Sequence, residues 1–219
     1  MSRAKLKRFA EVWERDNVLE PGKDMYEKIK GQWNSYQFKN DNPITIELAC
    51  GRGEYSVGLA RMFPNKNFIG VDIKGDRIWK GSTMAVDEKL ENVAFLRTII
   101  QLLEKFFAPE EVSEIWITFP DPRPKDRDEK RRLTNGRFLD IYKNVIAKDG
   151  WIRLKTDNTG LFEYTLEVIK ERKDIKDLAY TFDVYNSEFE ADCHGIKTRY
   201  EKKHTALGAD IKYLKFQFV

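Results

Sequence analysis

The chain has little cysteine and little histidine. Its 219 residues include two cysteines, Cys50 and Cys193, and two histidines, His194 and His204. Two cysteines cannot form the disulfide framework of a small secreted domain, so a reducing cytoplasm is expected. The spacing of these four residues matches no zinc motif, and we therefore expect no metal site.

Long apolar runs and a charge excess of one sign are also missing. No stretch approaches the roughly 18 apolar residues of a membrane span. The first residues, MSRAKLKRFAEVWERD, lack the apolar core of a signal peptide, so neither a membrane segment nor secretion is expected. Charged residues make up 34%, yet the net charge is only +3. Any binding to nucleic acid must therefore come from local clusters of cations.

Apolar residues are numerous enough for a sizeable core, at 41% hydrophobic and 13% aromatic. Apolar runs bounded by turn residues predict strands, and apolar residues at helical spacing predict helices between them. This alternation indicates an α/β fold with a mostly parallel sheet. The predicted strands are residues 44–49, 68–71, 93–96, 115–119, 150–156, 178–184 and 211–218. The predicted helices include residues 75–90 and 160–172, and apolar residues at 102–107 suggest another after the third strand.

The first 43 residues differ in composition from the rest. They open with four cations before any acid, Arg3, Lys5, Lys7 and Arg8, and residues 23–38 show loose helical spacing. The basic opening is either a solvated, partly disordered terminus or an arm that contacts a polyanion. The turn at residues 41–43 predicts a boundary between a basic arm and helix, residues 1–43, and a main domain, residues 44–219.

A rigid turn follows the fourth predicted strand. Three prolines at every second position, in the sequence PDPRP of residues 120–124, cannot continue a strand or enter a helix interior. They fix the carboxylate of Asp121 just beyond the carboxyl end of a strand, where open α/β sheets bind ligands. A mixed-charge segment with five cations follows at residues 125–132. It is either a solvated loop or, if it turns helical near Lys130, a cationic face for a polyanion.

A glycine turn marks a second candidate site. Glu47-x-x-x-Gly51-x-Gly53 lies between the first predicted strand and a helix, and Asp72 ends the second strand, 21 residues after Gly51. Glycine lets the chain turn tightly beside a ligand, and a carboxylate such as Asp72 can accept both hydroxyls of a ribose. The pattern fits a dinucleotide or S-adenosylmethionine. Ser56 stands where a dinucleotide fingerprint has glycine or alanine.

Glu47 discriminates better between these two cofactors. A carboxylate within an apolar strand is costly to bury without a partner. Like charges would repel beside a pyrophosphate, whereas the ammonium of a methionine moiety would attract it. The alternative is a glutamate at the end of the strand, paired with a surface lysine.

Six short motifs in order, ELACGRG, VDIKG, TFPDP with KRR, LKTD and TRYE, identify a family. Over residues 44–218 the chain resembles the bacterial tRNA (guanine-N7-)-methyltransferases of the TrmB type. The resemblance implies a class I S-adenosylmethionine-dependent methyltransferase fold. This is a Rossmann-like, seven-stranded, mostly parallel sheet with an antiparallel last strand and helices on both faces.

The resemblance also implies the cofactor, partner and site residues. S-adenosylmethionine would be the donor and guanine 46 of the tRNA variable loop the acceptor, in a monomer or homodimer. The donor would be held by Glu47, Gly51, Gly53 and Asp72, and Asp121 would lie between donor and target base. Residues holding the substrate would be Lys125, Asp157, Thr198, Arg199, Tyr200 and Glu201. Residues facing RNA phosphate would be Arg127, Lys130, Arg131 and Arg132.

The chain departs from the family pattern at three places. Arg123 stands where the family often has tryptophan, and Asp128 stands where a histidine is common. Residues 98–100, Thr-Ile-Ile, lack the acid that often binds adenine. Backbone groups or Gln101 are the alternatives for adenine.

The chemistry of guanine N7 sets what the site must do. N7 carries a lone pair and no proton, so no strong base and no nucleophilic Cys50 is needed. The ring becomes cationic, and a carboxylate such as Asp121 would stabilise that charge. Three rival functions remain at this point: a methyltransferase for a small molecule, a nicotinamide-dependent oxidoreductase, and a tRNA-binding protein with a vestigial donor site.

Overall fold

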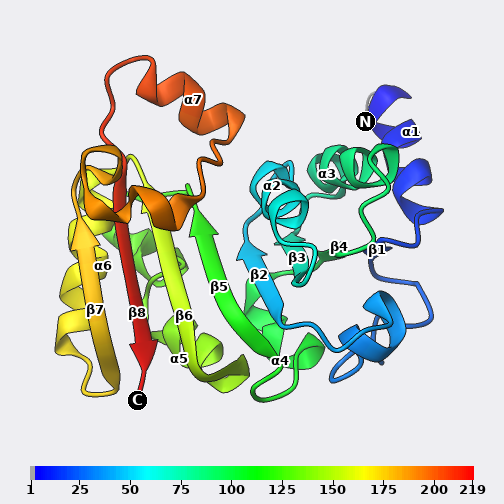
Figure 1. Cartoon of the computed structure of the whole chain (residues 1–219), viewed down its shortest axis with the longest axis horizontal. Coiled ribbons are helices and arrows are strands. Elements are labelled where there is room, and N and C mark those ends of the chain that lie inside the picture. The colour runs from blue at the N-terminus through cyan, green and yellow to red at the C-terminus, as the bar shows by residue number, and fades with distance from the viewer. Residues whose placement is uncertain (1–2) are drawn as a thin grey trace.

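The computed structural model describes residues 3–219 as a single sheet with helices on both faces (Figure 1). The eight strands lie in the order β1-β4-β3-β2-β5-β6-β8-β7. Their bounds are Val18–Leu19 (β1), Ile44–Leu48 (β2), Asn67–Asp72 (β3), Val93–Arg97 (β4), Val112–Thr118 (β5), Ile146–Thr156 (β6), Ile175–Thr181 (β7) and Lys212–Phe218 (β8).

Seven α-helices connect or precede the strands within residues 3–219. They are Arg3–Trp13 (α1), Glu54–Met62 (α2), Gly75–Asp87 (α3), Leu103–Phe106 (α4), Gly136–Val145 (α5), Thr159–Glu171 (α6) and Arg199–Thr205 (α7). The shorter helical segments are Trp33–Phe38 (η1), Ile100–Leu102 (η2), Asp126–Arg131 (η3), Val184–Asn186 (η4) and Glu188–Cys193 (η5). None of the helices in this part of the chain has the length and apolar character to cross a bilayer.

The topology confirms the expected fold class. Strands β1 to β6 pair in parallel, whereas β8 pairs antiparallel with both β6 and β7. The sheet has one strand more than the seven expected, the two-residue β1, which pairs with β4 at one edge. The segment before residue 44 thus extends the same sheet, and α1 packs against α3 through an ion pair of Lys5 with Asp76 and the stacking of Arg8 on Trp79.

The core has two layers, one on each face of the sheet, because side chains along a strand alternate between faces. Ile115 and Ile117 of β5 pack in the layer that contains α4, α5 and α6. Trp116, between them, packs in the layer that contains α1, α2 and α3. The central strands β2 and β3 are buried along their whole length, as expected for parallel strands covered on both faces.

Several element bounds differ from those predicted. Residues 23–38 form turns and only the short η1, because Gly31 has a left-handed φ of 74° and the carboxylate of Glu111 accepts from its N–H. The late strand predicted at 178–184 is β7, Ile175–Thr181. It ends where the Thr181 hydroxyl bonds the backbone of Asp183 and η4 begins. The fifth predicted strand starts earlier than 150, and the predicted helix after β4 is only α4 with η2.

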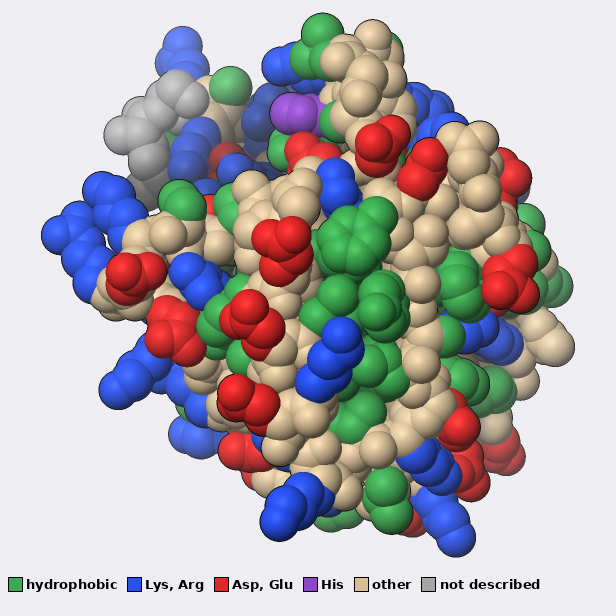
Figure 2. All heavy atoms as spheres, turned by 90° about the vertical axis from the view of Figure 1, so that its left-hand side faces the viewer, with side chains coloured by type: hydrophobic (Ala, Val, Ile, Leu, Met, Phe, Trp, Pro, Cys, Tyr) green, Lys and Arg blue, Asp and Glu red, His purple; other side chains and the backbone are tan. Residues whose placement is uncertain are grey.

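One side of the sheet remains an open edge. Strand β7 and the segment after it expose Tyr180 and Phe182, at 39% and 44% of their surface. These two rings pack with Phe162 of α6 as an aromatic cluster. Figure 2 shows the resulting apolar area in the middle of that face, with charged side chains around it.

Candidate active site

The carboxyl ends of four parallel strands meet at one edge of the sheet, below α7 in Figure 1. Strand register aligns Leu48 with both Val71 and Ile117, and Thr118 with Lys155. The candidate acids therefore come together there. Ala49 and Phe119, the first residues beyond β2 and β5, have positive φ of 56° and 49°, and so does Arg123 (48°) in the proline turn. Such backbone strain tends to gather at functional sites.

Glu47 is buried near the end of β2, and the protein supplies hydrogen bonds to it. One carboxylate oxygen accepts from the Thr118 hydroxyl at 2.6 Å, and the other accepts from the Ser56 backbone N–H at 2.9 Å and from the Ser56 hydroxyl. Burial raises the pKa of Glu47 to about 7, against these hydrogen bonds, which lower it. Glu47 is therefore partly protonated at neutral pH in the free protein. The alternative of a surface lysine partner does not apply, because its partners are Ser56 and Thr118.

Asp72 and the glycine turn form one unit. The Gly51 N–H donates to one Asp72 oxygen at 2.9 Å, and the Lys74 N–H donates to the other at 2.8 Å. Gly53 caps α2 with a φ of 66°, and a Cβ there would lie 2.5 Å from the Phe95 ring. A side chain at Gly53 would thus be both strained and crowded. The turn holds Asp72 in place and leaves each of its oxygens a free acceptor position.

Two adjoining cavities lie over these residues and share Ala49 as lining. The larger, of about 440 Å³, is called here the acceptor cavity because residues of the TRYE motif line it. Glu47, Thr118 and Phe119 form its floor, and Thr198, Arg199 and Tyr200 one wall. The smaller, of about 260 Å³, lies beside Asp72 and has apolar walls, including Ile99, Ile100 and Phe138, with polar groups from Thr98 and Gln101.

Asp121 lines the smaller cavity and is largely exposed, with 63% of its side chain accessible. Its carboxylate forms an ion pair with Arg123, with 3.1 Å between Oδ2 and Nε. Arg123, which departs from the family pattern, thus supplies the partner of the central acid. Because the pair faces solvent, it contributes little to stability and can separate readily.

Asp157 follows β6 and contacts Tyr200, which lines the acceptor cavity. Its Oδ2 accepts from the Tyr200 hydroxyl at 3.0 Å and lies 3.3 Å from Nδ1 of His204. The Tyr200 ring stacks on His204 at a centroid distance of 4.0 Å, and it lies tilted by 49° against the Phe119 ring at 5.3 Å. Burial and the bond to Asp157 raise the pKa of Tyr200 to about 12, so it remains a hydrogen-bond donor. Tyr200 is still 46% exposed, so an aromatic face remains available.

Glu201 is predicted from the sequence to contact the substrate, and such a contact needs an exposed side chain. The structure buries Glu201 instead, whereas Thr198 lines the acceptor cavity. Glu201 is fully buried and forms a 2.7 Å ion pair with Lys155, also fully buried. It also accepts a hydrogen bond from Tyr185. The Thr198 side chain accepts from the Glu201 N–H at 3.1 Å, and the Glu201 carboxylate accepts from the Thr198 N–H, a capping box at the start of α7. These residues fix α7 over the sheet edge.

The cations after the proline turn lie on η3 and its flanks. Arg131 lines the smaller cavity and pairs with Asp128 at 3.1 Å. Arg132 donates to the Arg123 carbonyl and stacks on the Tyr164 ring at 4.3 Å. Lys125, Arg127 and Lys130 are exposed and have no carboxylate partner within residues 3–219. Of the two alternatives for this segment, the structure has the helical turn near Lys130, as η3.

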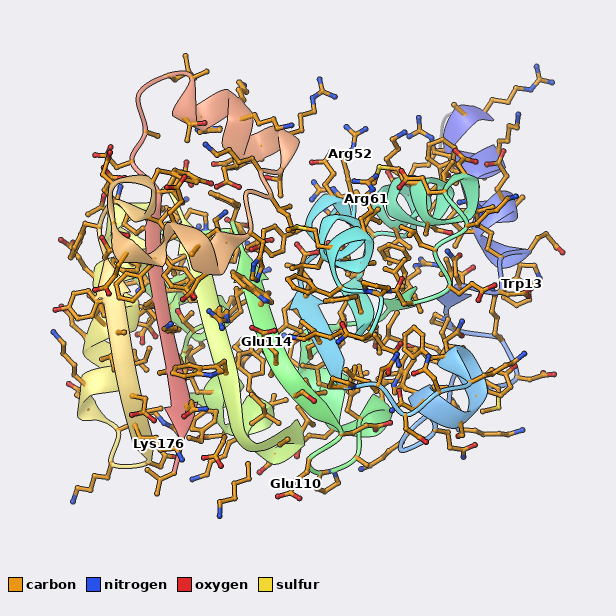
Figure 3. The ribbon with its side chains drawn as sticks, in the orientation of Figure 1. Trp13, Arg52, Arg61, Glu110, Glu114 and Lys176 are labelled. Atoms are coloured by element: carbon orange, nitrogen blue, oxygen red, sulfur yellow. The ribbon has the colours of Figure 1, made fainter. Side chains whose placement is uncertain are left out.

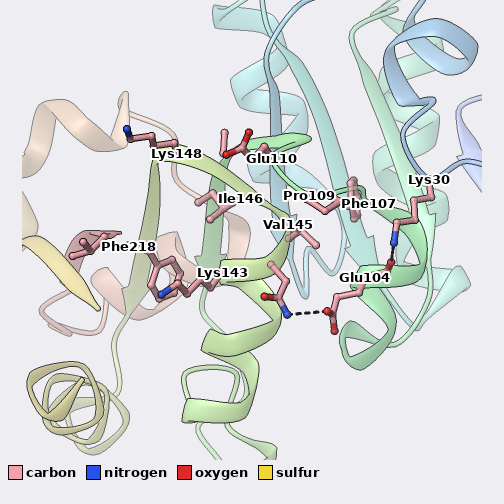
Figure 4. A pocket seen from close by; sticks show the side chains of 13 residues that line it. Lys30, Glu104, Phe107, Pro109, Glu110, Lys143, Val145, Ile146, Lys148 and Phe218 are labelled. Carbon is pink, nitrogen blue, oxygen red and sulfur yellow. Dashed lines mark hydrogen bonds between the residues drawn. The ribbon is translucent and has the colours of Figure 1, made fainter. Parts of the chain in front are cut away.

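Another cavity, of about 620 Å³, lies at the opposite edge of the sheet (Figure 4). Some of its polar side chains are engaged with one another or with neighbours: Lys30 donates to the Glu104 carbonyl, Asn144 to the Glu104 carboxylate, and Lys143 pairs with Asp174. No pair of its side chains has the arrangement of a catalytic site. Within residues 3–219, no group of three or more histidine, cysteine or acidic side chains is placed to hold a metal ion.

Comparison with solved structures defines the class. A 16S rRNA methyltransferase, KamB, superposes with a TM-score of 0.62 at 14% identity, covering 90% of this chain and 94% of that one. A 16S rRNA methyltransferase from Catenulisporales acidiphilia, solved with its cosubstrate SAM, superposes with a TM-score of 0.55 at 12% identity, covering 86% and 90%. These likenesses show the fold, which is that of the class I methyltransferases.

Sequence comparison defines the family. The family described as "putative methyltransferase" matches residues 41–214. The tRNA (guanine-N(7)-)-methyltransferase of Cytophaga hutchinsonii is 49% identical over 100% of this chain and 99% of its own length, and that of Christiangramia forsetii is 47% identical over 99% and 98%. The corresponding Listeria monocytogenes enzyme is 38% identical over 88% and 87%. The chain belongs to the tRNA (guanine-N(7)-)-methyltransferase family.

The residues present fit S-adenosylmethionine. The free acceptor positions of Asp72 suit ribose hydroxyls, and the apolar slot of Ile99, Ile100 and Phe138 suits a flat purine. Glu47 lines the adjoining cavity and can face a cationic amino-acid moiety there. A pyrophosphate would instead meet the buried Glu47, so the nicotinamide alternative fits poorly.

Sequence reasoning missed the partners of the key acids. In the sequence Ser56 stands out only as a mismatch to a dinucleotide pattern. In the structure its backbone N–H and its hydroxyl both donate to Glu47. In the sequence Lys155 stands out only as part of the LKTD motif. In the structure it is the buried partner of Glu201. A lysine within an apolar strand is as costly to bury as Glu47, and that signal was present in the sequence.

Proposed function

We propose that this enzyme transfers a methyl group from S-adenosylmethionine to N7 of guanine 46 in the variable loop of tRNA, in the cytoplasm. The observation that carries the proposal is the junction of the two cavities. The smaller cavity, beside Asp72, adjoins the acceptor cavity. Glu47 and Tyr200 line the acceptor cavity together with several cations.

The donor would lie across both cavities. We assign its adenosine to the smaller cavity, with ribose on Asp72, and its amino-acid moiety to the Glu47 side of the acceptor cavity. Gly51 and Gly53 provide the close backbone approach. Gln101 lines the smaller cavity and, with backbone groups of residues 98–100, is the candidate for adenine recognition in place of the missing acid. When bound, the donor supplies an electrophilic methyl group on a sulfonium centre.

The acceptor base would enter beside Tyr200. A base removed from its stack is commonly held against an aromatic face. Tyr200 offers such a face, and its bond to Asp157 and its contact with Phe119 fix the ring. Asp157 and the backbone of α7 are the groups that can accept from or donate to the base edge. The buried Glu201 acts through Lys155 and the α7 cap, and we assign it a positioning role.

Asp121 is the proposed catalytic residue. N7 needs no base to deprotonate it, and the guanine ring gains positive charge as the methyl group arrives. A carboxylate at this point stabilises that charge. Arg123 neutralises Asp121 in the free protein, so the proposal requires the 3.1 Å ion pair to open when RNA binds. Arg123 is then available to an RNA phosphate, together with Lys125, Arg127, Lys130, Arg131 and Arg132.

The decisive experiment uses unmodified tRNA and labelled S-adenosylmethionine. The product is treated with borohydride and then aniline, which cleaves at 7-methylguanine, and the cleavage position is mapped. We expect label in tRNA and cleavage at guanine 46. Label without cleavage at a guanine would reject N7 chemistry, and cleavage at another guanine would reject position 46. Failure of tRNA to accept label would favour a small-molecule substrate or a vestigial site.

A further inference from the structure

A third cavity, of about 580 Å³, continues from the acceptor cavity between α2 and the segment leading into α7. We call it the α2–α7 groove. It shares Glu54 and Arg199 with the acceptor cavity, so the two cavities adjoin. Its remaining cationic lining consists of Arg61, Lys197 and Lys202. None of these residues belongs to the cation cluster on η3.

Charge in the α2–α7 groove is strongly positive. Glu54 is its only acidic lining residue within the described chain, and its carboxylate is engaged by the Arg199 N–H at 2.6 Å and by Arg52 at 3.8 Å. Arg61 is paired with Glu88. The Lys202 side chain and the Arg199 guanidinium are exposed and have no carboxylate partner within residues 3–219. Lys197 lies over the Tyr185 ring at 3.7 Å, which restrains it while leaving its charge unneutralised.

Helix α7 distributes its cations over the two depressions. Arg199 and Lys202 are three residues apart, so they share a face, and both line the groove. Lys203 and Tyr200 instead line the acceptor cavity, together with Arg52 and Arg77. Figure 3 shows Arg52 and Arg61 above α2, next to the α7 segment. The result is a row of cations that passes from the acceptor cavity into the groove.

The order of the cavities gives this row its direction. Arg131 of η3 lines the smaller cavity, which adjoins the acceptor cavity at Ala49, and the acceptor cavity adjoins the groove at Glu54 and Arg199. By these shared lining residues the acceptor cavity lies between the smaller cavity, which Arg131 lines, and the α2–α7 groove. A nucleotide inserted in the middle has backbone leaving it in two directions.

We infer that the α2–α7 groove binds the sugar-phosphate backbone of tRNA on the side of the target nucleotide opposite η3. Lys197 and Lys202 each contact a phosphate, and Arg199 stands at the junction with the acceptor cavity. Lysine and arginine side chains at such positions fix register and contribute affinity without reading sequence. The inference rests on the proposed function, because it takes tRNA as the ligand.

The test measures how the Kd of fluorescein-labelled unmodified tRNA depends on salt, comparing wild type with Lys197→Gln/Lys202→Gln. Each phosphate contact contributes about 0.7 to 0.9 to the slope of log K against log salt. We therefore expect the double variant to lower the slope by about 1.4 to 1.8. The matched control, Lys105→Gln/Lys148→Gln, removes the same charge from exposed positions far from α7, at α4 and near the amino-terminal edge of the sheet. Its slope should equal that of wild type.

Two further measurements separate the possible failures. Binding of S-adenosylmethionine, measured by calorimetry, should be unchanged in the double variant. Lys202→Gln alone, at an exposed position, should still lower the slope of log K against log salt by about half as much. An unchanged slope in the groove variants, or an equal fall in the control, overturns the inference. If wild type binds tRNA with the expected slopes but transfers no label to it, the groove assignment holds and the proposed function fails.

Discussion

The half of the site proposed for the donor, with Glu47 and Asp72, is built differently from the half proposed for the acceptor, with Asp121 and Asp157. These are called the donor half and the acceptor half. On the donor side, Glu47 and Asp72 are buried, and backbone and hydroxyl donors hold them without any cation. On the acceptor side, Asp121 is exposed and paired with Arg123, while Asp157 depends on Tyr200 and His204. The half proposed for the donor is thus held by fixed contacts within the protein, whereas the half proposed for the acceptor has acids whose ion pairs can be exchanged.

This difference follows from the ligands. A small cofactor can be enclosed, and enclosed carboxylates need fixed neutral donors. A large RNA cannot be enclosed, so its contacts must be exposed cations and groups that release weak partners. Among the described residues, 3–219, only one ion pair on the acceptor side is fully buried, Lys155 with Glu201, and it supports α7. The predictions that follow act on this contrast, from the largest effect to the smallest.

Lys155→Met should have the largest effect, because it leaves the Glu201 carboxylate buried without its cation. Loss of one partner of a buried pair costs about 3–5 kcal/mol of unfolding free energy. Urea denaturation would measure this loss. Adding Glu201→Gln should restore much of the stability, since glutamine still completes the capping box at Thr198.

Lys155→Met and the double variant Lys155→Met/Glu201→Gln also test whether the acceptor half can change while the donor half keeps its affinity for the cofactor. The double variant should bind S-adenosylmethionine as wild type does, because neither residue lines the smaller cavity or contacts Glu47 or Asp72. Its KM for tRNA should rise, because α7 is less firmly held. Equal stability of Lys155→Met and wild type would show that the ion pair does not fix α7.

Asp121→Asn should lower kcat for tRNA methylation by about 10²–10³, the usual loss on removing an electrostatic stabiliser. Asparagine keeps the size of the side chain but cannot stabilise the cationic ring. Arg123→Gln serves as the matched control: it removes the partner of Asp121 and leaves the carboxylate. It should raise the KM for tRNA and leave kcat unchanged at saturation. Wild-type turnover in Asp121→Asn would reject its catalytic role.

The donor half was the more predictable of the two from sequence. Glycines in a strand–turn–helix pattern, an acid in an apolar strand and an acid 21 residues on are local signals, and they indicated the fold and cofactor class correctly. The acceptor half depends on contacts between distant segments. Tyr200 with Asp157, and Glu201 with Lys155, join α7 to β6 across 43 and 46 residues of chain. Periodicity in the sequence does not predict contacts between such distant segments. The sequence therefore predicts Glu201 as a substrate contact, whereas the structure buries it against Lys155.

Glu47 gives the donor half a pH dependence. Its pKa of about 7 in the free protein means that binding a cationic moiety favours loss of its proton. Affinity for S-adenosylmethionine should rise about tenfold between pH 6 and pH 8 as Glu47 ionises. Calorimetry across this range, in buffers of different ionisation enthalpy, should also detect proton release. Glu47→Gln should abolish both effects, since burial raises the pKa of the neighbouring Cys50 thiol well above its usual range.

The raised pKa of Glu47 also affects stability. A folded-state pKa of about 7 exceeds the ordinary glutamate pKa of 4.5, so as pH rises the unfolded chain releases this proton first. The contribution of Glu47 to stability is therefore fully present below about pH 4.5 and is lost as pH rises through about 7. Thermal unfolding of wild type and Glu47→Gln should differ in slope against pH within that window. Parallel curves would show that Glu47 titrates normally.

Tyr200→Phe should have the smallest effect and should separate the two roles of this side chain. Phenylalanine keeps the ring against Phe119 and His204 but removes the hydroxyl that donates to Asp157 at 3.0 Å. Loss of one such hydrogen bond costs about 1 kcal/mol, or about fivefold in KM for tRNA. Tyr200→Ala removes the ring as well and should cost a further 1–3 kcal/mol if a base stacks there, by the usual cost of losing one stacked base. If the two variants have equal KM values, the ring does not hold the base, and the exposed face of Tyr200 has no part in the acceptor site.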